Sequence, residues 1–432
     1  MKTGKSPHKR KSADQGHPIR LLTAVPICDG HDSAINTINL EFIRHGIEVI
    51  YLGYHRSARD IARAAIQEDV RAIGLSSYNG GHVEFFEEVI DRLHQQGASD
   101  IAVFGGGGGT ITSQDARLMK RKGVDEVFFA GTPLAKMIDF VMDRYGRPRK
   151  AERPGPAGRR GGRPWDDRAL ARQLTATELA SAAGASRPAV ARSGDSLAPV
   201  LGLTGPGGAG KTTLIDELIL RLLKAKPPAR LAILSHDPSL IGRGALLGDR
   251  ATMIHSQDDR VFMRSMATRG QAGGLSPATH DCLALLAQSN FDYVVIETVG
   301  TGQEAMPFQK NGIVDLTVLV MNPDYGSRLQ LQKIVMLDLA DIVVVNKSDL
   351  QRARTAHSEI EHRLEQNRPA RRSLGAGGRH QQLVDTVAKR HRDPGVDRLF
   401  ELISNRSVAA VSSSRRSGAK ADDRRSKRRR RS

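Results

Sequence analysis

The stretch that decides the fold of the second half of this chain is Gly205-Pro-Gly-Gly-Ala-Gly-Lys-Thr212. It fits G-x-x-x-x-G-K-[ST] at every fixed position, and it lies between an apolar strand pattern (199–203) and a helical pattern (213–224). The glycines let backbone N–H groups turn inward around phosphate oxygens, and the following helix points its positive dipole end at the same anion. A glycine-rich turn that matches by chance is the alternative, but both flanks are correct. The sequence therefore predicts a P-loop that binds a nucleotide.

Individual roles within this loop follow from the chemistry of phosphate binding. Lys211 is expected to reach the β- and γ-phosphates, and Thr212 to offer its hydroxyl to Mg²⁺. We expect further cofactor contacts from the remaining loop and first-turn residues, Gly207, Gly208, Ala209, Gly210 and Thr213.

The base is indicated by Asn346-Lys347-Ser-Asp349, which follows the apolar strand pattern at 341–345. An aspartate there accepts two hydrogen bonds from the guanine ring N–H and exocyclic amine, whereas adenine offers no such donor pair. Asn346, Lys347 and Asp349 are therefore predicted to select GTP over ATP.

Two more strand patterns end in an acid, Asp237 and Glu297. Each carboxylate would lie at the carboxyl end of a strand, near Thr212, where Mg²⁺ needs oxygen ligands or bound waters. Helix capping is the alternative role for both. We expect Lys211, Thr212 and Glu297 to be the catalytic residues of GTP hydrolysis.

The region 20–140 alternates short apolar strands with helical segments, which predicts a parallel sheet. Strands are expected at 19–27, 47–53, 70–76, 101–105 and 126–129. Three unusual loops, at 29–34, 76–82 and 105–109, follow the carboxyl ends of these strands, where such sheets bind ligands. The chain thus reads as two doubly wound α/β domains.

These three loops resemble the cobalamin-binding domain of coenzyme-B12-dependent acyl-CoA mutases and methionine synthase. The Asp-x-His-x-x-Gly motif of that family is similar to Asp29-Gly-His31-Asp-Ser-Ala34, with alanine in place of the glycine. The resemblance implies that His31 is the axial cobalt ligand and that Asp29 hydrogen-bonds its other ring nitrogen. It also places Ser76 near the benzimidazole of adenosylcobalamin, with room for the nucleotide tail left by Gly105, Gly106 and Gly107.

The second half resembles the G-protein chaperones that attend methylmalonyl-CoA mutase and its relatives. The resemblance runs through the P-loop, Asp237-Pro-Ser, Gly244–Arg250, 260–270, 297–304 and Asn346–Asp349. It implies that Mg²⁺ is held by Thr212, Asp237, Asp249, Glu297 and Thr298, and that residues 240–270 form a switch region. Cobalamin domain followed by G-protein is the order found in the fused isobutyryl-CoA mutases. We expect no mutase barrel here, since a barrel needs roughly 250 residues.

Composition sets the domain limits. The ends are strongly basic: residues 1–20 carry +5 and residues 415–432 carry +8 of the net +18. No aromatic residues are interleaved with this charge, so solvated ends are favoured over nucleic-acid binding. We expect a basic arm at 1–19, a cobalamin-binding domain at 20–143, a flexible and helical linker at 144–198, a GTPase domain at 199–405 and a basic tail at 406–432.

The segment 368–379 is rich in arginine and glycine where a G-domain needs its sixth strand and the loop that closes on guanine. The family pattern returns at 393–403, which suggests compensating frameshifts, with a native basic tail as the alternative.

The leading hypothesis is a cobalamin-binding GTPase, Mg²⁺-dependent, that loads or guards the cofactor of an acyl-CoA mutase of the isobutyryl-CoA type. Isomerase activity would need a separate mutase barrel subunit as partner. The alternatives are a non-enzymatic cobalamin carrier or sensor with a GTP switch, and a remnant of the fused enzyme. We expect a homodimer without membrane contact, and two cysteines favour a reducing cytoplasm.

Overall fold

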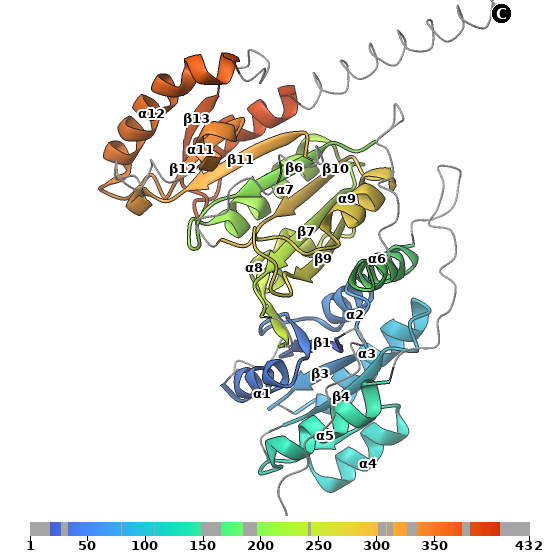
Figure 1. Cartoon of the computed structure of the whole chain (residues 1–432). Coiled ribbons are helices and arrows are strands. Elements are labelled where there is room, and N and C mark those ends of the chain that lie inside the picture. The colour runs from blue at the N-terminus through green and yellow to red at the C-terminus, as the bar shows by residue number, and fades with distance from the viewer. Residues whose placement is uncertain are drawn as a thin grey trace, which may run out of the picture.

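Two parallel β-sheets form the framework of the protein, as a computed structural model shows (Figure 1). The structure describes residues 18–26, 33–78, 80–107, 109–147, 166–184, 197–240, 243–300, 308, 314–325, 335–373 and 381–406. The first half, 18–147, is drawn in blue to teal, and the second half, 197–406, in green to red. Both halves are doubly wound α/β folds, as predicted from the alternation of strands and helices.

The first sheet has the strand order β5-β4-β3-β1-β2-β8. Its strands are β1 (Arg20–Ala24), β2 (Glu48–Tyr51), β3 (Ala72–Ser76), β4 (Ala102–Gly106), β5 (Val127–Phe128) and β8 (Ala245–Leu247). All of them pair in parallel. Because β2 lies on one side of β1 and β3 on the other, the chain reverses its winding between β1 and β3. Ligands of such sheets bind beside that point, outside the carboxyl ends of the strands.

Helices cover both faces of the first sheet. They are α1 (Ser33–Arg44), α2 (Ala58–Gln67), α3 (His82–Gln95), α4 (Ser113–Arg121) and α5 (Leu134–Tyr145). The apolar faces of α2 and α3 pack on one side of the sheet around Ile61, Phe86 and Val89. Phe104, Phe128 and Tyr145 form an aromatic cluster on the other side. These two layers hold the strand ends in place.

The second sheet has the order β13-β12-β11-β6-β10-β7-β9, again with every pair parallel. Its strands are β6 (Val200–Thr204), β7 (Leu231–Asp237), β9 (Val261–Ala267), β10 (Tyr293–Glu297), β11 (Leu316–Met321), β12 (Ile342–Asn346) and β13 (Gln382–Thr386). Since β6 is central, the loop that follows it opens at the middle of the carboxyl edge.

The helices that the structure describes in the second half are α7 (Lys211–Ala225), α8 (Asp249–Thr252), α9 (Thr279–Gln288), α11 (Val335–Leu339), α12 (Ala353–Ser373) and a last helix over 394–406. Short 3₁₀ turns occur at His255–Gln257 and Pro323–Tyr325. Within the described ranges, no helix is long and apolar enough to cross a membrane.

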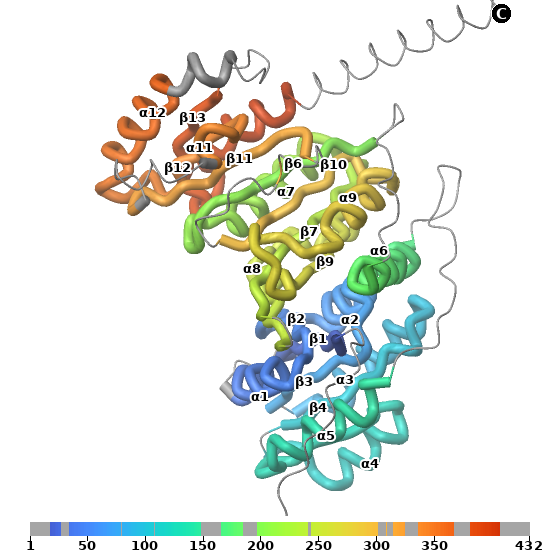
Figure 2. The backbone as a smooth tube through the Cα atoms, in the orientation of Figure 1, coloured from blue at the N-terminus to red at the C-terminus, as the bar shows by residue number. Residues whose placement is uncertain are grey.

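Strand β8 joins the two halves. In sequence it lies between β7 and β9 of the second sheet, but its pairing partner is β2 of the first sheet. The backbones meet so closely that a Cβ atom on Gly244 would lie 1.9 Å from the carbonyl oxygen of Ile47. The side chains of Ala245 and Leu247 belong to the core of the first half. A segment of the second half thus completes the first sheet (Figure 2).

A buried group of charges, here called the interface cluster, also lies between the halves. The carboxylate of Glu68, at the end of α2, accepts from Arg20 of β1, from Arg250 of α8 and from the backbone and hydroxyl of Ser265 in β9. The cluster contains Arg20, Glu48, Glu68, Glu178, Arg250, Arg264 and Arg269. Glu178 comes from α6 (Asp167–Ala182), the helical part of the linker, which packs against both α2 and α9.

One expectation about the C-terminal region is wrong. The sixth strand of the G-domain was expected within 368–379, and the sequence there suggested that it was lost. The structure instead extends α12 to Ser373 and places the strand later, at Gln382–Thr386, fully paired with β12. The strand was overlooked because the arginine-rich segment stands just before it.

Candidate functional site

The P-loop follows β6 and opens α7, as the sequence predicted. Gly208 and Gly210 have φ angles of 72° and 86°, a region that favours glycine. Gly207 and Gly208 are exposed at the tip of the loop, whereas Ala209 is buried beneath it. Thr213 is exposed on the first turn of the helix. The loop therefore presents backbone at a helix N-terminus, which is the arrangement that binds phosphate.

Lys211 lies over this loop. Its side chain is buried, and its Nζ donates to the carbonyl oxygens of Gly205 (3.1 Å) and Pro206 (3.4 Å). Gly300 approaches from the end of β10, so closely that a Cβ there would lie 2.7 Å from the Lys211 Nζ and 2.5 Å from the Gly207 nitrogen. Only glycine fits at position 300, which brings a second backbone segment to the loop.

Three carboxylates gather beside Thr212 and form what we call the acidic cluster: Asp237, Asp249 and Glu297. Thr212 Oγ1 donates to Glu297 Oε1 at 2.9 Å and lies 3.5 Å from Asp249 Oδ1. Ser235 on β7 donates to Asp249, and the backbone N–H of Gly248 donates to Asp237 Oδ2 at 3.1 Å. Residues far apart in sequence therefore meet at the carboxyl ends of β7 and β10, as predicted.

The acidic cluster is poorly neutralised by its surroundings. Burial, and then the negative charge of Asp249, raise the pKa of Asp237 to about 8. The same two causes raise the pKa of Glu297, while Lys211 and Thr212 act in the opposite direction. Burial also raises the pKa of Asp249, against hydrogen bonding from Ser235. Three acids near one lysine produce a site that attracts further positive charge.

Thr298 differs from the other predicted ligands. Its buried hydroxyl donates to Thr204 Oγ1 at 3.0 Å, within the sheet. In the described part of the chain, no three His, Cys, Asp or Glu side chains form a ready-made metal cage. Mg²⁺ does not need one, because it keeps several waters and takes one or two protein carboxylates together with phosphate oxygens.

The predicted guanine residues follow β12. Asn346 is buried, and its amide nitrogen donates to the carbonyl of Ala209 in the P-loop at 2.8 Å. Its amide oxygen accepts from Thr386 Oγ1 and Ala388 N, each at 3.0 Å. Lys347 has a φ of 58°, in the left-handed region. Asn346 thus links the P-loop to the end of β13.

Asp349 pairs with Lys389 Nζ at 2.7 Å, and hydrogen bonding to this lysine lowers the pKa of Asp349. Thr386, Ala388 and Lys389 were not predicted, because the strand before them was not recognised. Ser235 was missed as well. A small polar residue two positions before an acid that ends a strand is a weak pattern by itself. Only the hydrogen bond from Ser235 to Asp249 in the structure places Ser235 in this site.

The carboxyl edge of the first sheet carries the other predicted site. Ser76 ends β3 beside Gly106 of β4. A Cβ on Gly105, Gly106 or Gly107 would lie within 2.3 Å of a backbone oxygen of a neighbouring segment, so all three positions require glycine. Asp29 and His31 lie outside the described residues, directly after Pro26 at the end of β1. The described parts of this site therefore lie together at the carboxyl ends of β3 and β4, and β3 borders the winding reversal between β1 and β3.

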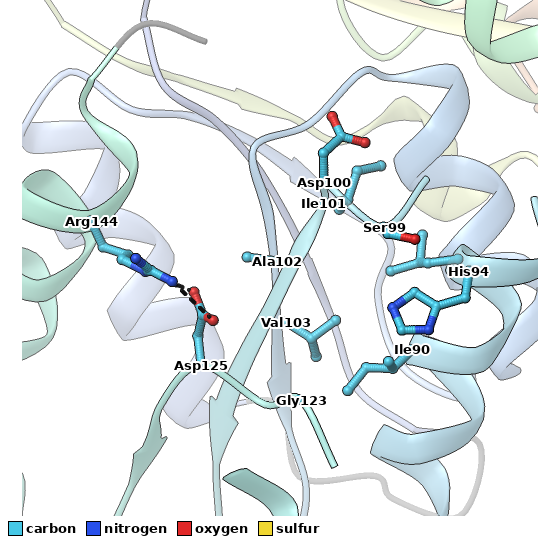
Figure 3. Close-up of a pocket in the computed structure, with 11 residues that line it drawn as sticks. Ile90, His94, Ser99, Asp100, Ile101, Ala102, Val103, Gly123, Asp125 and Arg144 are labelled. Atoms are coloured by element: carbon cyan, nitrogen blue, oxygen red, sulfur yellow. Dashed lines mark hydrogen bonds and ion pairs between the residues drawn. The ribbon is translucent and has the colours of Figure 1, made fainter. Parts of the chain in front are cut away.

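A separate cavity of about 230 Å³ opens at the opposite edge of this sheet, near the start of β4 (Figure 3). Asp100, Ile101 and Val103 line it, and Arg144 and Asp125 are joined across its rim by a hydrogen bond of 3.0 Å. This cavity lies away from Ser76 and the glycines, and none of the predicted site residues lines it.

Comparison with known proteins gives the same two regions. Residues 19–136 match the B12 binding domain, and residues 170–431 match the family described as methylmalonyl-CoA mutase-associated GTPase MeaB. The fused isobutyryl-CoA mutase of Geobacillus kaustophilus is 36% identical over 403 residues, which cover 89% of this chain and 36% of that protein. Those of Cupriavidus metallidurans and Nocardia farcinica are 38% and 37% identical, with 35% and 36% of their lengths covered.

The chain therefore spans about a third of the length of these relatives. The match to the GTPase family covers more than half of the chain, and the match to the B12 binding domain precedes it. The chain belongs to the family of the methylmalonyl-CoA mutase-associated GTPase MeaB, and it carries a B12-binding domain in front of the GTPase.

Proposed function

We propose that this protein binds and hydrolyses GTP with Mg²⁺, and that it acts as the chaperone and cofactor-loading portion of a coenzyme-B12-dependent acyl-CoA mutase of the isobutyryl-CoA type. The observation that carries the nucleotide part is the meeting of Thr212 with Glu297 and Asp249 at the P-loop. The family match to a GTPase and the order of the two regions support the rest.

The residues present fit Mg²⁺. Glu297 Oε2 is buried and has no hydrogen-bond partner in the described residues, although its other oxygen accepts from Thr212. Two further carboxylates, Asp237 and Asp249, face the same place, and burial raises the pKa of both. A bound cation would favour their charged forms. We propose that Thr212, Asp237, Asp249 and Glu297 hold the ion directly or through water, with Thr298 supporting the strand end. Bound Mg²⁺ would offset the negative charge of the phosphates.

Hydrolysis would depend mainly on positioning. Backbone N–H groups of Gly207, Gly208 and Gly210 would hold the phosphates, and Lys211 would leave the loop carbonyls for the β- and γ-phosphate oxygens. There its charge would stabilise the transition state as water attacks the γ-phosphate. The Gly300 backbone is close enough to complete the cradle. Asp349 would exchange Lys389 for guanine, and Lys347 would pack along the base.

For cobalamin, we propose the carboxyl edge of the first sheet. Ser76 and the three glycines fit this role, because the close backbone contacts at Gly105, Gly106 and Gly107 exclude side chains from that edge. His31 would bind the cobalt of cobalamin, and Asp29 would hydrogen-bond the other ring nitrogen of His31. With adenosylcobalamin as the bound form, the expected partner is an acyl-CoA mutase barrel, and we propose that the chain forms a homodimer.

A hydrolysis assay on the full chain tests the nucleotide part. We expect Mg²⁺-dependent release of phosphate from GTP and much less from ATP, and loss of turnover in Lys211→Ala. Tight GTP binding without turnover above background would instead support a cobalamin carrier with a GTP switch. Failure to bind GTP would refute both.

The absorption spectrum of bound cobalamin tests the other half. If His31 binds the cobalt, His31→Ala should change the spectrum of the bound cofactor while cobalamin still binds. An unchanged spectrum would remove His31 from the site. Asp29→Asn is the matched variant, since it should weaken the ligand without removing it.

A further inference from the structure

Strand β8 stands between two of the proposed magnesium carboxylates. Asp237 ends β7 just before it, and Asp249 begins α8 just after it. Asp249 follows the end of β8 by two residues, so the pairing of Ala245–Leu247 with β2 of the other half limits where its carboxylate can be. Asp237 is paired with Ala267 in its own sheet, and its carboxylate meets this segment by accepting from the N–H of Gly248 at 3.1 Å.

Contacts from the first half also hold the helix that carries Asp249. Arg250 is buried, and its guanidinium donates to Glu68 Oε1 at 3.1 Å and to Gln67 Oε1 at 3.2 Å. Arg56, in the loop after β2, donates to the carbonyl of Ala251 at 2.6 Å. Arg250 donates from α8 to the B12-binding half, and Arg56 donates from the B12-binding half to α8. These two contacts hold α8 against the B12-binding half.

Arg56 extends this connection toward the predicted cobalamin loop. Its backbone N–H donates to the carbonyl of Val25, and it forms an isolated parallel bridge with Pro26. Pro26 directly precedes the segment that contains Asp29 and His31. One residue therefore touches both the end of β1 and the helix that begins with Asp249.

We infer that the B12-binding half positions the magnesium carboxylates of the GTPase half, through the seating of β8 on β2 and the contacts of Arg56 and Glu68 with α8. Arg56 and Glu68 are positioning residues in this scheme, since neither touches Thr212 or the P-loop. The inference rests on the proposed Mg²⁺ site. By linkage, Mg²⁺ and nucleotide would in turn stabilise the seating of β8 on the first sheet.

Gly244→Ala tests the seating of the strand in the full chain. Its new Cβ would overlap the Ile47 carbonyl, so β8 must shift away from β2. We expect a rise of roughly tenfold or more in the Mg²⁺ concentration that gives half-maximal tight binding of a fluorescent GDP analogue. A change of this size follows when a residue that supports a metal ligand is removed. Leu246→Ala, on the outward side of the same strand, is the control and should match the wild type.

Arg56→Met tests the same inference with little risk to folding. It removes the contact with Ala251, and we expect the same direction of change. Its control is Arg59→Met, because Arg59 also pairs across the halves, with Asp259, but is exposed and does not reach α8. At saturating Mg²⁺, GTP hydrolysis by Arg56→Met should recover toward the wild-type rate, since every proposed ligand is still present.

The outcomes separate the two proposals. If the wild type shows no Mg²⁺-dependent nucleotide binding, the proposed function fails and this inference fails with it. If the wild type does bind, but Gly244→Ala and Arg56→Met stay within about twofold of their controls, the inference alone is overturned. A loss of turnover that saturating Mg²⁺ does not restore would also overturn it, because the defect would then not concern metal positioning.

Discussion

The interface cluster and the acidic cluster are both groups of buried or half-buried charged side chains, but they differ in charge balance. In the interface cluster, four arginines meet three glutamates, and the Glu68 carboxylate accepts from arginines and from the Ser265 backbone. In the acidic cluster, Lys211 acts on Glu297 and Asp249 among the three carboxylates, and one oxygen of Glu297 has no partner among the described residues. A nearly balanced group stabilises a contact between the halves, whereas an unbalanced group of acids favours the approach of a cation.

The largest expected effect on GTP turnover among these variants is that of Glu297→Gln in the acidic cluster. Removal of this charge should lower GTP turnover by roughly 100- to 1000-fold, as for other groups that support transition-state charge. The free energy of unfolding without Mg²⁺ should stay constant or rise, because the variant removes a carboxyl whose charged form is disfavoured by burial. Single-turnover hydrolysis and denaturant unfolding measure the two effects. A large loss of stability would place Glu297 with the structural charges.

Glu178→Gln should give the opposite result. Glu178 is buried in α6 and pairs with Arg264 at 2.7 Å and Arg269 at 3.1 Å. Breaking a buried pair leaves an uncompensated charge, so we expect a loss of about 3–5 kcal/mol in the free energy of unfolding. GTP turnover of the folded fraction should be retained. Glu88→Gln, which breaks the exposed pair with Arg92, is the control and should cost little.

The pH dependence of stability separates the clusters further. In the folded protein the pKa of Asp237 is raised from 3.8 to about 8, so between these values the folded state binds more protons than the unfolded state. Without Mg²⁺, the free energy of unfolding should therefore fall as pH rises from about 4 to about 8, by at most about 1.4 kcal/mol per pH unit from this group.

Denaturant titrations of the wild type and Asp237→Asn across that range measure this slope. The variant should show a flatter profile, because its side chain does not titrate. Added Mg²⁺ should raise stability most at the alkaline end, where the carboxylates are free of protons. Identical slopes in the two proteins would exclude Asp237 as the cause.

The smallest effect is expected at the guanine residues. Lys389→Ala removes the ion pair with Asp349, a pair in which the lysine is largely exposed. Such pairs contribute little, so GTP affinity should change by no more than about fivefold. Titration with a fluorescent GTP analogue measures it. A much larger loss would mean that Lys389 itself holds the nucleotide.

The sequence predicted the elements that have a strong local pattern. The alternation in the first half, the P-loop with both flanks, and the strands that end in Asp237, Glu297 and Asn346 are all confirmed. The approach of Asp237 and Glu297 to Thr212 was also anticipated, because strand ends of a parallel sheet share one edge. Asp249 begins α8 and ends no strand, and only the family resemblance implied its place there.

What the sequence did not predict depends on partners that are distant in the chain. β8 is only three residues long, and nothing in Ala245–Leu247 indicates pairing with β2. β9 contains Arg264 and Ser265, which do not look like strand-core residues until Glu178 and Glu68 are placed beside them. Charge balance between distant residues leaves no local pattern.

The pairing of β8 with β2 has a consequence for dividing this protein. Although the linker separates the two halves in sequence, cutting there would not yield two complete sheets, because a fragment ending before residue 197 lacks β8. That fragment would expose the backbone edge of β2 and an apolar gap where Ala245 and Leu247 had packed. Open strand edges pair with other chains, so the fragment should self-associate or aggregate. A fragment that keeps the B12-binding half soluble must therefore also include β8, which comes from the GTPase half.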